Sequence, residues 1–267
     1  MSAPLLHGID VSKWNDRINW EAVAKHNVKF AFIRCGVGAA KGGFTLDPKF
    51  AVNVNGAHSV GIPVGVYMYS YARSVSAAQA EAQGMLGAIS GYKDKITWPV
   101  VYDIEEDEQA KLGQAICTAM CNAFCDMVEK AGYTPMVYCN ANWYKNYLLP
   151  NMMRHDLWLA YWRSKDTDAI PHTVWQYTDA GNVGGISGNV DLNIAYKDYG
   201  AAPQTAEELE QTLTEPAPEP MPKDEADGWA KAEWEEAYRA GILDGTRPKD
   251  PISRQEMAVI LKRLELI

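Results

Sequence analysis

The 267-residue chain lacks long apolar runs. No segment reaches the roughly 18 uninterrupted apolar residues that a membrane-spanning helix needs, so the sequence argues against a transmembrane protein. Residues 1–10 contain neither a basic segment nor an apolar core, which predicts that no secretion signal is present and that the protein is made in the cytoplasm. We therefore expect no membrane partner, and a substrate outside the cytoplasm would need another route of delivery.

Cysteine is scarce, with five residues in all. An odd number of cysteines in a chain made in the cytoplasm favours free thiols over a disulfide framework. Cys117, Cys121 and Cys125 repeat every four residues and have no neighbouring histidine that could complete a metal site. The five histidines form no metal-binding spacing either. We predict that this cysteine stripe is the buried face of a helix and that the protein binds no metal.

Basic residues are outnumbered, with 25 Lys and Arg against 34 Asp and Glu and a net charge of −9. Much of the acidic excess falls in residues 201–230. No basic patch stands out, which argues against a nucleic-acid partner. A phosphate-binding glycine loop of recognised spacing is also missing, which disfavours an intracellular barrel enzyme of small-molecule metabolism.

Eight short apolar, β-rich runs recur through the first 200 residues, and helical patterns fit between the early runs. Alternation of strand and helix implies a parallel sheet, whereas only loops separate the last three runs. We therefore predict an α/β fold, an irregular (β/α) barrel with about eight strands and fewer helices, over residues 1–200. The expected strands are 6–11, 30–35, 63–71, 98–102, 135–139, 157–161, 174–177 and 190–195, and the expected helices are 20–25, 48–59, 77–89 and 114–131.

The buried run 98–102 leads into two acidic residues, Asp103 and Glu105. Residues i and i+2 of a strand point to the same face, with Cα atoms about 6–7 Å apart. Two carboxyl groups crowded at the end of a barrel strand have raised proton affinity, which suits acid/base chemistry at the place where barrel active sites lie. Taken alone, the acidic run 103–108 is more typical of a solvated loop.

Other polar and aromatic side chains follow or end the predicted strands, so we expect them to line one cleft. Carboxylates and amides suit sugar hydroxyls, and flat aromatic faces suit sugar rings. The composition agrees, with 9 Trp and 14 Tyr against 5 Phe, although most of the tryptophans are expected in the core. The candidates are Asp10, Arg34, Tyr67, Tyr69, Tyr138, Trp162, Trp175, Gln176 and Asp191.

Seven motifs in fixed order then give a family resemblance over residues 5–199. They are GIDVSKW (8–14), AFIR (31–34), GIPVGVYMY (61–69), VYDIE (101–105), LWLAY (157–161), WQY (175–177) and GISGNVDLN (185–193). Together they resemble the glycoside hydrolase family 25 lysozymes, the Chalaropsis-type muramidases common among phage endolysins.

The resemblance implies cleavage of the β-1,4 bond between N-acetylmuramic acid and N-acetylglucosamine in peptidoglycan. By motif, Glu105 matches the general acid/base, Asp103 its partner carboxylate, and Asp10 and Asp191 the other acids of the cleft. A retaining mechanism is implied, in which Asp103 is the nucleophile or orients an attacking substrate acetamido group; we favour the second. Hydrolysis needs two carboxyl groups and water, so no cofactor is expected. The alternative is a non-catalytic wall-glycan binding protein on the same barrel.

The C-terminal part reads as a linker followed by a small helical module. Residues 201–224 are rich in Pro and Glu, which is typical of an extended linker. Residues 225–267 are similar to a single S-layer homology repeat, which implies binding of a secondary cell-wall polymer with Arg254 as a contact. A helical hairpin for homo-oligomerisation fits equally well, because about forty residues rarely bury enough surface alone.

The absence of a signal, together with the family resemblance, leads us to expect a phage or prophage endolysin. Such a protein would accumulate in the cytoplasm and act on the cell wall after holin-type release.

Overall fold

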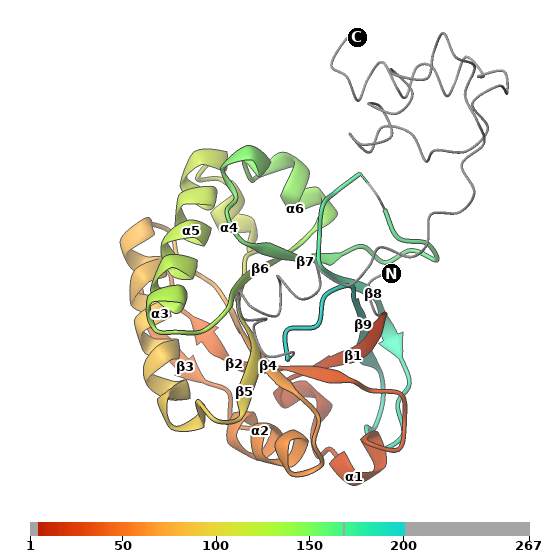
Figure 1. Cartoon of the computed structure of the whole chain (residues 1–267). Helices are drawn as coiled ribbons and strands as arrows, with labels where there is room; N and C mark the ends of the chain where they lie inside the picture. The colour runs from red at the N-terminus through yellow and green to blue at the C-terminus, as the bar shows by residue number, and fades with distance from the viewer. Residues whose placement is uncertain (1–4, 168, 201–267) are drawn as a thin grey trace, which may run out of the picture. The chain divides into compact units, whose positions relative to one another are not determined.

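The computed structural model describes residues 5–167 and 169–200 (Figure 1). The chain divides between residues 202 and 203, and all the described residues belong to the first unit. The predicted linker 201–224, the predicted module 225–267 and Arg254 lie outside the described residues, so they stay predictions.

Eight strands close into a barrel, as the apolar runs predicted. Each neighbouring pair is hydrogen-bonded, and pairing of the first two barrel strands completes the ring. Seven of the eight run parallel, and the last is antiparallel to both of its neighbours. In ring order the strands are β1 (Leu6–Val11), β2 (Phe30–Gly38), β4 (Val64–Tyr69), β5 (Ile96–Asp103), β6 (Pro135–Asn140), β7 (Asp156–Ala160), β8 (Val174–Gly181) and β9 (Val190–Ala195).

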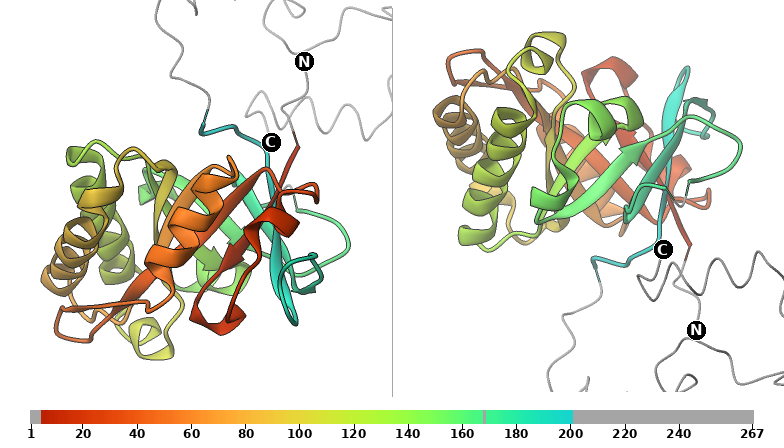
Figure 2. Two further views of the ribbon diagram at one scale, coloured as in Figure 1. Left: turned by 90° about the horizontal axis from the view of Figure 1, so that it is seen from below. Right: turned by 90° about the horizontal axis from the view of Figure 1, so that it is seen from above.

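The four predicted helices are present, with ends that differ by a few residues, and lie outside the strands. Figures 1 and 2 show α3 and α5 side by side on one outer side of the barrel. Only loops join β7 to β8 and β8 to β9, which confirms the irregular end of the barrel. The helices are α1 (Trp20–Val23), α2 (Phe50–Ser59), α3 (Val75–Ile89), α4 (Asp107–Ala110), α5 (Gln114–Lys130) and α6 (Ala141–Asn146), with single 3₁₀ turns η1 (Lys13–Asn15), η2 (Ser90–Tyr92) and η3 (Pro150–Met152).

Besides the 3₁₀ turns, one short strand and two short helices were not predicted. Strand β3 (Phe44–Leu46) forms a hairpin with the end of β2 outside the ring. Helix α4 begins after Glu106, whose side chain and that of Gln109 form a capping box. Helix α6 begins after Asn140, whose side chain accepts a hydrogen bond from the backbone N–H of Trp143. Elements this short show too little periodicity to be recognised from a sequence pattern.

The barrel interior has an aromatic layer beneath a polar one. On β2, Phe30, Phe32 and Arg34 alternate and therefore point inward together. Phe32 stacks on Trp158 with ring centroids 4.4 Å apart, and Phe30 stacks on Trp98 at 4.1 Å. These rings fill the lower interior, and a pocket opens at the carboxyl ends of the parallel strands.

The helices cover the outside of the strands with a second apolar cluster. Cys117, Cys121 and Cys125 of α5 are all buried in it, which confirms that the cysteine stripe is a buried helix face. Burial raises the pKa of the Cys117 thiol to about 11, so this group stays a neutral, unreactive thiol. No helix in the described ranges is both long and apolar enough to cross a membrane.

Candidate active site

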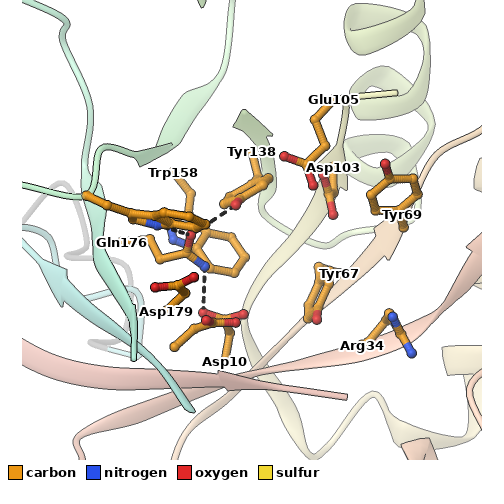
Figure 3. A pocket seen from close by; sticks show the side chains of 12 residues that line it. Asp10, Arg34, Tyr67, Tyr69, Asp103, Glu105, Tyr138, Trp158, Gln176 and Asp179 are labelled. Atoms are coloured by element: carbon orange, nitrogen blue, oxygen red, sulfur yellow. Dashed lines mark hydrogen bonds between the residues drawn. The ribbon is translucent and has the colours of Figure 1, made fainter. Parts of the chain in front are cut away.

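A pocket opens at the carboxyl ends of the barrel strands (Figure 3). The structure brings ten of the eleven site residues predicted for the barrel into its lining, from segments that are far apart in the sequence. They are Asp10, Arg34, Tyr67, Tyr69, Asp103, Glu105, Tyr138, Trp162, Gln176 and Asp191. Trp158 and Asp179 complete the lining.

Trp175 is the exception, because the structure does not bring it to the pocket. Neighbouring residues of a strand point to opposite faces, and Gln176 of β8 points inward. Trp175 therefore faces away, where it is buried and donates its indole N–H to the backbone oxygen of Tyr161 at 2.7 Å. The structure therefore does not place Trp175 in the pocket lining, and its role as a sugar contact stays a prediction.

Asp103 is the last residue of β5 and is 4 % exposed. Its Oδ1 has no hydrogen-bond partner among the described residues. Burial raises the pKa of Asp103 well above its usual range, and the nearby carboxyl groups of Glu105 and Asp10 add to the rise, while Arg34 opposes it. A buried carboxylate oxygen without a partner is costly, which agrees with the raised proton affinity of Asp103.

Glu105 lies two residues further on, beside Asp103 in the cleft (Figure 3). Burial is the main reason that its pKa is raised, and the charges of Glu106 and Asp191 contribute. A hydrogen bond with the side chain of Asn140 works in the opposite direction. The arrangement favours the protonated form of Glu105 at a pH where an exposed glutamate is ionised, which a general acid requires.

Asp10 and Asp191 occupy paired positions on the antiparallel strands β1 and β9. The prediction that barrel closure makes them neighbours is therefore confirmed. Burial raises the pKa of Asp10 well above its usual range, and repulsion from Asp191 raises it further, whereas hydrogen bonds from Asn193 and Gln176 lower it. The pKa of Asp191 is also raised, mainly by burial.

Arg34 is the one cation among the described residues that line the pocket. Its Nε and Nη2 both lie 2.8 Å from Oδ2 of Asp47. Asp47 is buried and also accepts hydrogen bonds from the backbone N–H groups of Lys13 and Lys49. Asp47 could not be singled out from the sequence, because an aspartate just before a helix is usually a cap or turn residue.

Asn193 and Trp158 were also missed. Asn193 is fully buried and donates to Oδ2 of Asp10 at 2.9 Å, while Trp158 donates its indole N–H to Oδ1 of Asn193 at 2.8 Å. A signal for Asn193 was present, because it follows Asp191 by two residues and so shares its face of β9. Nothing in the apolar run 157–161 distinguishes Trp158 from an ordinary core tryptophan.

A buried polar network supports the ends of β4 and β5 from behind. Oγ of Ser70 lies 2.7 Å from Oε2 of Glu81 and 2.7 Å from the hydroxyl of Tyr102. The backbone N–H of Tyr71 donates to Oε1 of Glu81, and Gln109 donates to Ser70. Burial raises the pKa of Glu81 to about 7, so this group titrates near neutrality although it does not line the pocket.

We expect Glu81→Gln to flatten the pH dependence of stability. The folded pKa of about 7 lies above the ordinary 4.5, so the stabilising contribution is complete below pH 4.5 and is lost as the pH rises through 7. The change amounts to about 3 kcal/mol at most. The test is the melting temperature of the wild type and of Glu81→Gln, measured from pH 4 to 8. Glu108→Gln, which changes a solvent-accessible glutamate, is the control. Parallel curves for wild type and Glu81→Gln would contradict it.

Comparison with known proteins identifies the fold and its family. The profile described as Glycosyl hydrolases family 25 matches residues 9–186. The uncharacterized protein YegX of Escherichia coli O157:H7 is 34 % identical over 197 residues, which cover 71 % of this chain and 69 % of YegX. Lysozyme M1 of Streptomyces globisporus is 30 % identical over 202 residues, covering 70 % of this chain and 67 % of the lysozyme.

Solved structures with the same fold are also found. The autolysin LytC of Streptococcus pneumoniae, in complex with a synthetic peptidoglycan ligand, superposes with a TM-score of 0.62 at 26 % identity, over 71 % of this chain. The chain spans 46 % of that autolysin. A family 25 glycosyl hydrolase of Bacillus anthracis superposes with a TM-score of 0.60 at 25 % identity, covering 77 % of this chain and 92 % of its own. With its closed barrel and cleft of acids, the chain belongs to glycosyl hydrolases family 25 and is a glycoside hydrolase of the lysozyme type.

Proposed function

We propose that the protein is a peptidoglycan hydrolase, an N-acetylmuramidase that cleaves the β-1,4 bond between N-acetylmuramic acid and N-acetylglucosamine. The observation that carries this proposal is the pair Asp103 and Glu105, which share one cleft and whose pKa values are both raised. The similarity to Lysozyme M1 and to the autolytic lysozyme of Clostridium acetobutylicum supports it, as does the peptidoglycan ligand of LytC.

Glu105 supplies the proton in this mechanism. In its protonated form it donates to the glycosidic oxygen as that bond breaks, and the leaving sugar departs as a neutral alcohol. The resulting carboxylate then accepts a proton from the water that attacks the anomeric carbon. Each turnover therefore returns Glu105 to the protonated form, and the reaction overall retains configuration.

Asp103 stabilises the positive charge that develops at the anomeric carbon. We favour a route in which the acetamido oxygen of the substrate attacks this carbon and Asp103 accepts a hydrogen bond from the acetamido N–H. Asp103 lines the pocket beside Glu105, which supports a direct interaction of its carboxyl group with the bound sugar. Direct attack by Asp103 is the competing route.

Aromatic side chains on two sides of the acids suit the faces of the sugar rings. Trp162 is 51 % exposed at the pocket although its indole N–H is bonded to Gln176. Tyr69 lies on the other side of the acids, where its hydroxyl donates to Glu106 at 3.2 Å and its ring lies 5.0 Å from that of Tyr71. An apolar face with its polar atom already bonded is typical of a sugar-stacking position.

Mass spectrometry of the sugars released from purified peptidoglycan tests the assignment. We expect new reducing ends that are muramic acid. New glucosamine ends would show that the other glycosidic bond is cleaved. Binding to peptidoglycan with no new reducing ends would instead favour the non-catalytic wall-glycan binding protein.

The delivery of the protein and the role of residues 225–267 complete the proposal. We propose a phage or prophage endolysin that reaches the wall after holin-type release. The similarity of residues 225–267 to an S-layer homology repeat supports attachment to a secondary cell-wall polymer, and homo-oligomerisation is the alternative role.

A further inference from the structure

Asp10 and Asp191 lie directly opposite each other on antiparallel strands. Paired positions of this kind place Cβ atoms about 4.5–5.5 Å apart, where like charges repel. Arg34, the one cation among the described pocket residues, is already bound to Asp47. A single proton shared by the two carboxyl groups relieves the repulsion, because the pair then carries one negative charge instead of two.

Two side-chain amides determine which oxygen of Asp10 can carry that proton. Nδ2 of Asn193 and Nε2 of Gln176 both donate to Oδ2 of Asp10, at 2.9 Å and 3.0 Å (Figure 3 shows the bond from Gln176). An oxygen that accepts two N–H donors has both of its lone pairs engaged. The proton is therefore restricted to Oδ1 of Asp10 or to Asp191.

Tryptophan side chains fix the orientation of both amides. An indole N–H can only donate. Nε1 of Trp158 donates to Oδ1 of Asn193 at 2.8 Å, and Nε1 of Trp162 donates to Oε1 of Gln176 at 3.1 Å. Because the oxygen of each amide faces an indole, its NH₂ group faces Asp10. Each amide therefore has one orientation that satisfies all of its partners.

Building on the proposed hydrolase function, we propose that Asn193 and Gln176, held by Trp158 and Trp162, are positioning residues for the acid pair. They keep Oδ2 of Asp10 free of a proton, so that the proton of the pair lies between Asp10 and Asp191. The pair then presents one fixed negative charge to the cleft, with its position set by four uncharged side chains. We call these four residues the amide relay.

The relay affects how the pair titrates. Donors to Oδ2 stabilise the charged form of Asp10 and lower its pKa against the effect of burial. Loss of one donor raises the pH at which the pair takes up a second proton, and the pair then loses its negative charge. Ionisable groups from several strands around the cleft interact with Asp10 or with Asp191. They are Arg34, Tyr67, Asp103, Glu105, Tyr138 and Asp179.

Trp158→Phe tests the relay, and Trp98→Phe is its matched control. Both tryptophans are buried, and each stacks on a phenylalanine of β2. They differ in their indole N–H, because Nε1 of Trp98 has no hydrogen-bond partner among the described residues. The readout is the initial rate of reducing-end release from purified peptidoglycan, measured across the acidic pH range.

In Trp158→Phe we expect the acidic limb of the rate profile to move up by about half to one pH unit, and in Trp98→Phe to stay at the wild-type position. Trp162→Phe, at a half-exposed site where folding is not at stake, should move the limb in the same direction by less, because the hydroxyl of Tyr138 still donates to Gln176. An unmoved limb in Trp158→Phe and Trp162→Phe, or an equal shift in Trp98→Phe, would overturn the proposal.

A substrate-free measurement separates the relay from the proposed function. In ¹⁵N-labelled wild-type protein, the side-chain NH₂ signals of Asn193 and Gln176 should shift together as the acid pair titrates. In Trp158→Phe the signals of Asn193 should move away from their wild-type positions and those of Gln176 should remain. If these NH₂ signals do not shift as the acid pair titrates, the proposed role of the amide relay is wrong. A normal titration in a protein that releases no reducing ends overturns the hydrolase function alone.

Discussion

Replacing Glu105 by glutamine is expected to lower the rate of peptidoglycan hydrolysis by about two to four orders of magnitude. Glutamine has nearly the same shape and can still interact with Asn140, but it has no proton to give to the glycosidic oxygen. The loss should therefore appear in kcat rather than in binding to the wall. Release of reducing ends measures the rate, and pull-down with insoluble peptidoglycan measures the binding.

The matched control for this change is Glu108→Gln. Glu108 belongs to the same acidic run, but it lies on α4 and its carboxylate pairs with Lys111. We expect wild-type activity from it. A variant Glu105→Gln that is as active as Glu108→Gln would show that another group donates the proton, and an unchanged circular dichroism spectrum would rule out misfolding as the cause of a loss.

The pH profile provides a second check on Glu105. Burial raises its pKa, so the acid form persists to a higher pH than the ordinary value of 4.5 allows. Activity should fall as the pH rises through that raised pKa, because the acid then loses its proton. In Glu105→Gln, the residual activity should lack this alkaline limb.

Replacing Asp103 by asparagine is expected to lower kcat by about two to three orders of magnitude. Asparagine keeps the volume of the side chain but removes the negative charge that faces the anomeric carbon. Its amide also offers an N–H where the acetamido N–H needs an acceptor. The control is Asp94→Asn, an exposed residue in the turn that precedes β5 at the other end of the same strand. Near wild-type activity in Asp103→Asn would reduce Asp103 to a bystander.

The two routes open to Asp103 give different results with substrate analogues. If the acetamido group of the substrate attacks, a thiazoline analogue of the cyclic intermediate should inhibit the wild-type enzyme and bind Asp103→Asn much more weakly. If Asp103 itself attacks, a 2-fluoro sugar with a good leaving group should leave a covalent adduct on Asp103, which peptide mass spectrometry would detect. Because we favour the first route, we expect the inhibition and no adduct.

The sequence predicted the barrel well because each barrel strand is buried and therefore apolar. Two of the predicted strands, β1 and β9, have the observed bounds. The hairpin strand β3 could not be predicted in the same way, because it lies outside the ring and two of its three residues are exposed. Its position depends on pairing with the end of β2, which is a tertiary interaction.

The charged residues of the candidate site could be predicted from the sequence. Residues whose direction depends on strand register were harder to predict. Asp103 and Glu105 stand out in the sequence because carboxyl groups at the end of a buried strand are unusual unless they have a function. Trp175 and Gln176 are adjacent, and the sequence alone does not tell which of them faces inward. Asn193 and Trp158 act through hydrogen bonds that exist only once β7, β9 and β1 surround the same space.

Strand β9 closes the barrel by pairing with β1, and the same strand completes the cleft. During synthesis, β1 has one bare edge until β9 emerges and pairs with it. The same strand delivers Asp191 and Asn193, so a nascent barrel without it lacks half of the acid pair. A growing polypeptide that has not yet supplied β9 therefore lacks both Asp191 and Asn193 in its cleft.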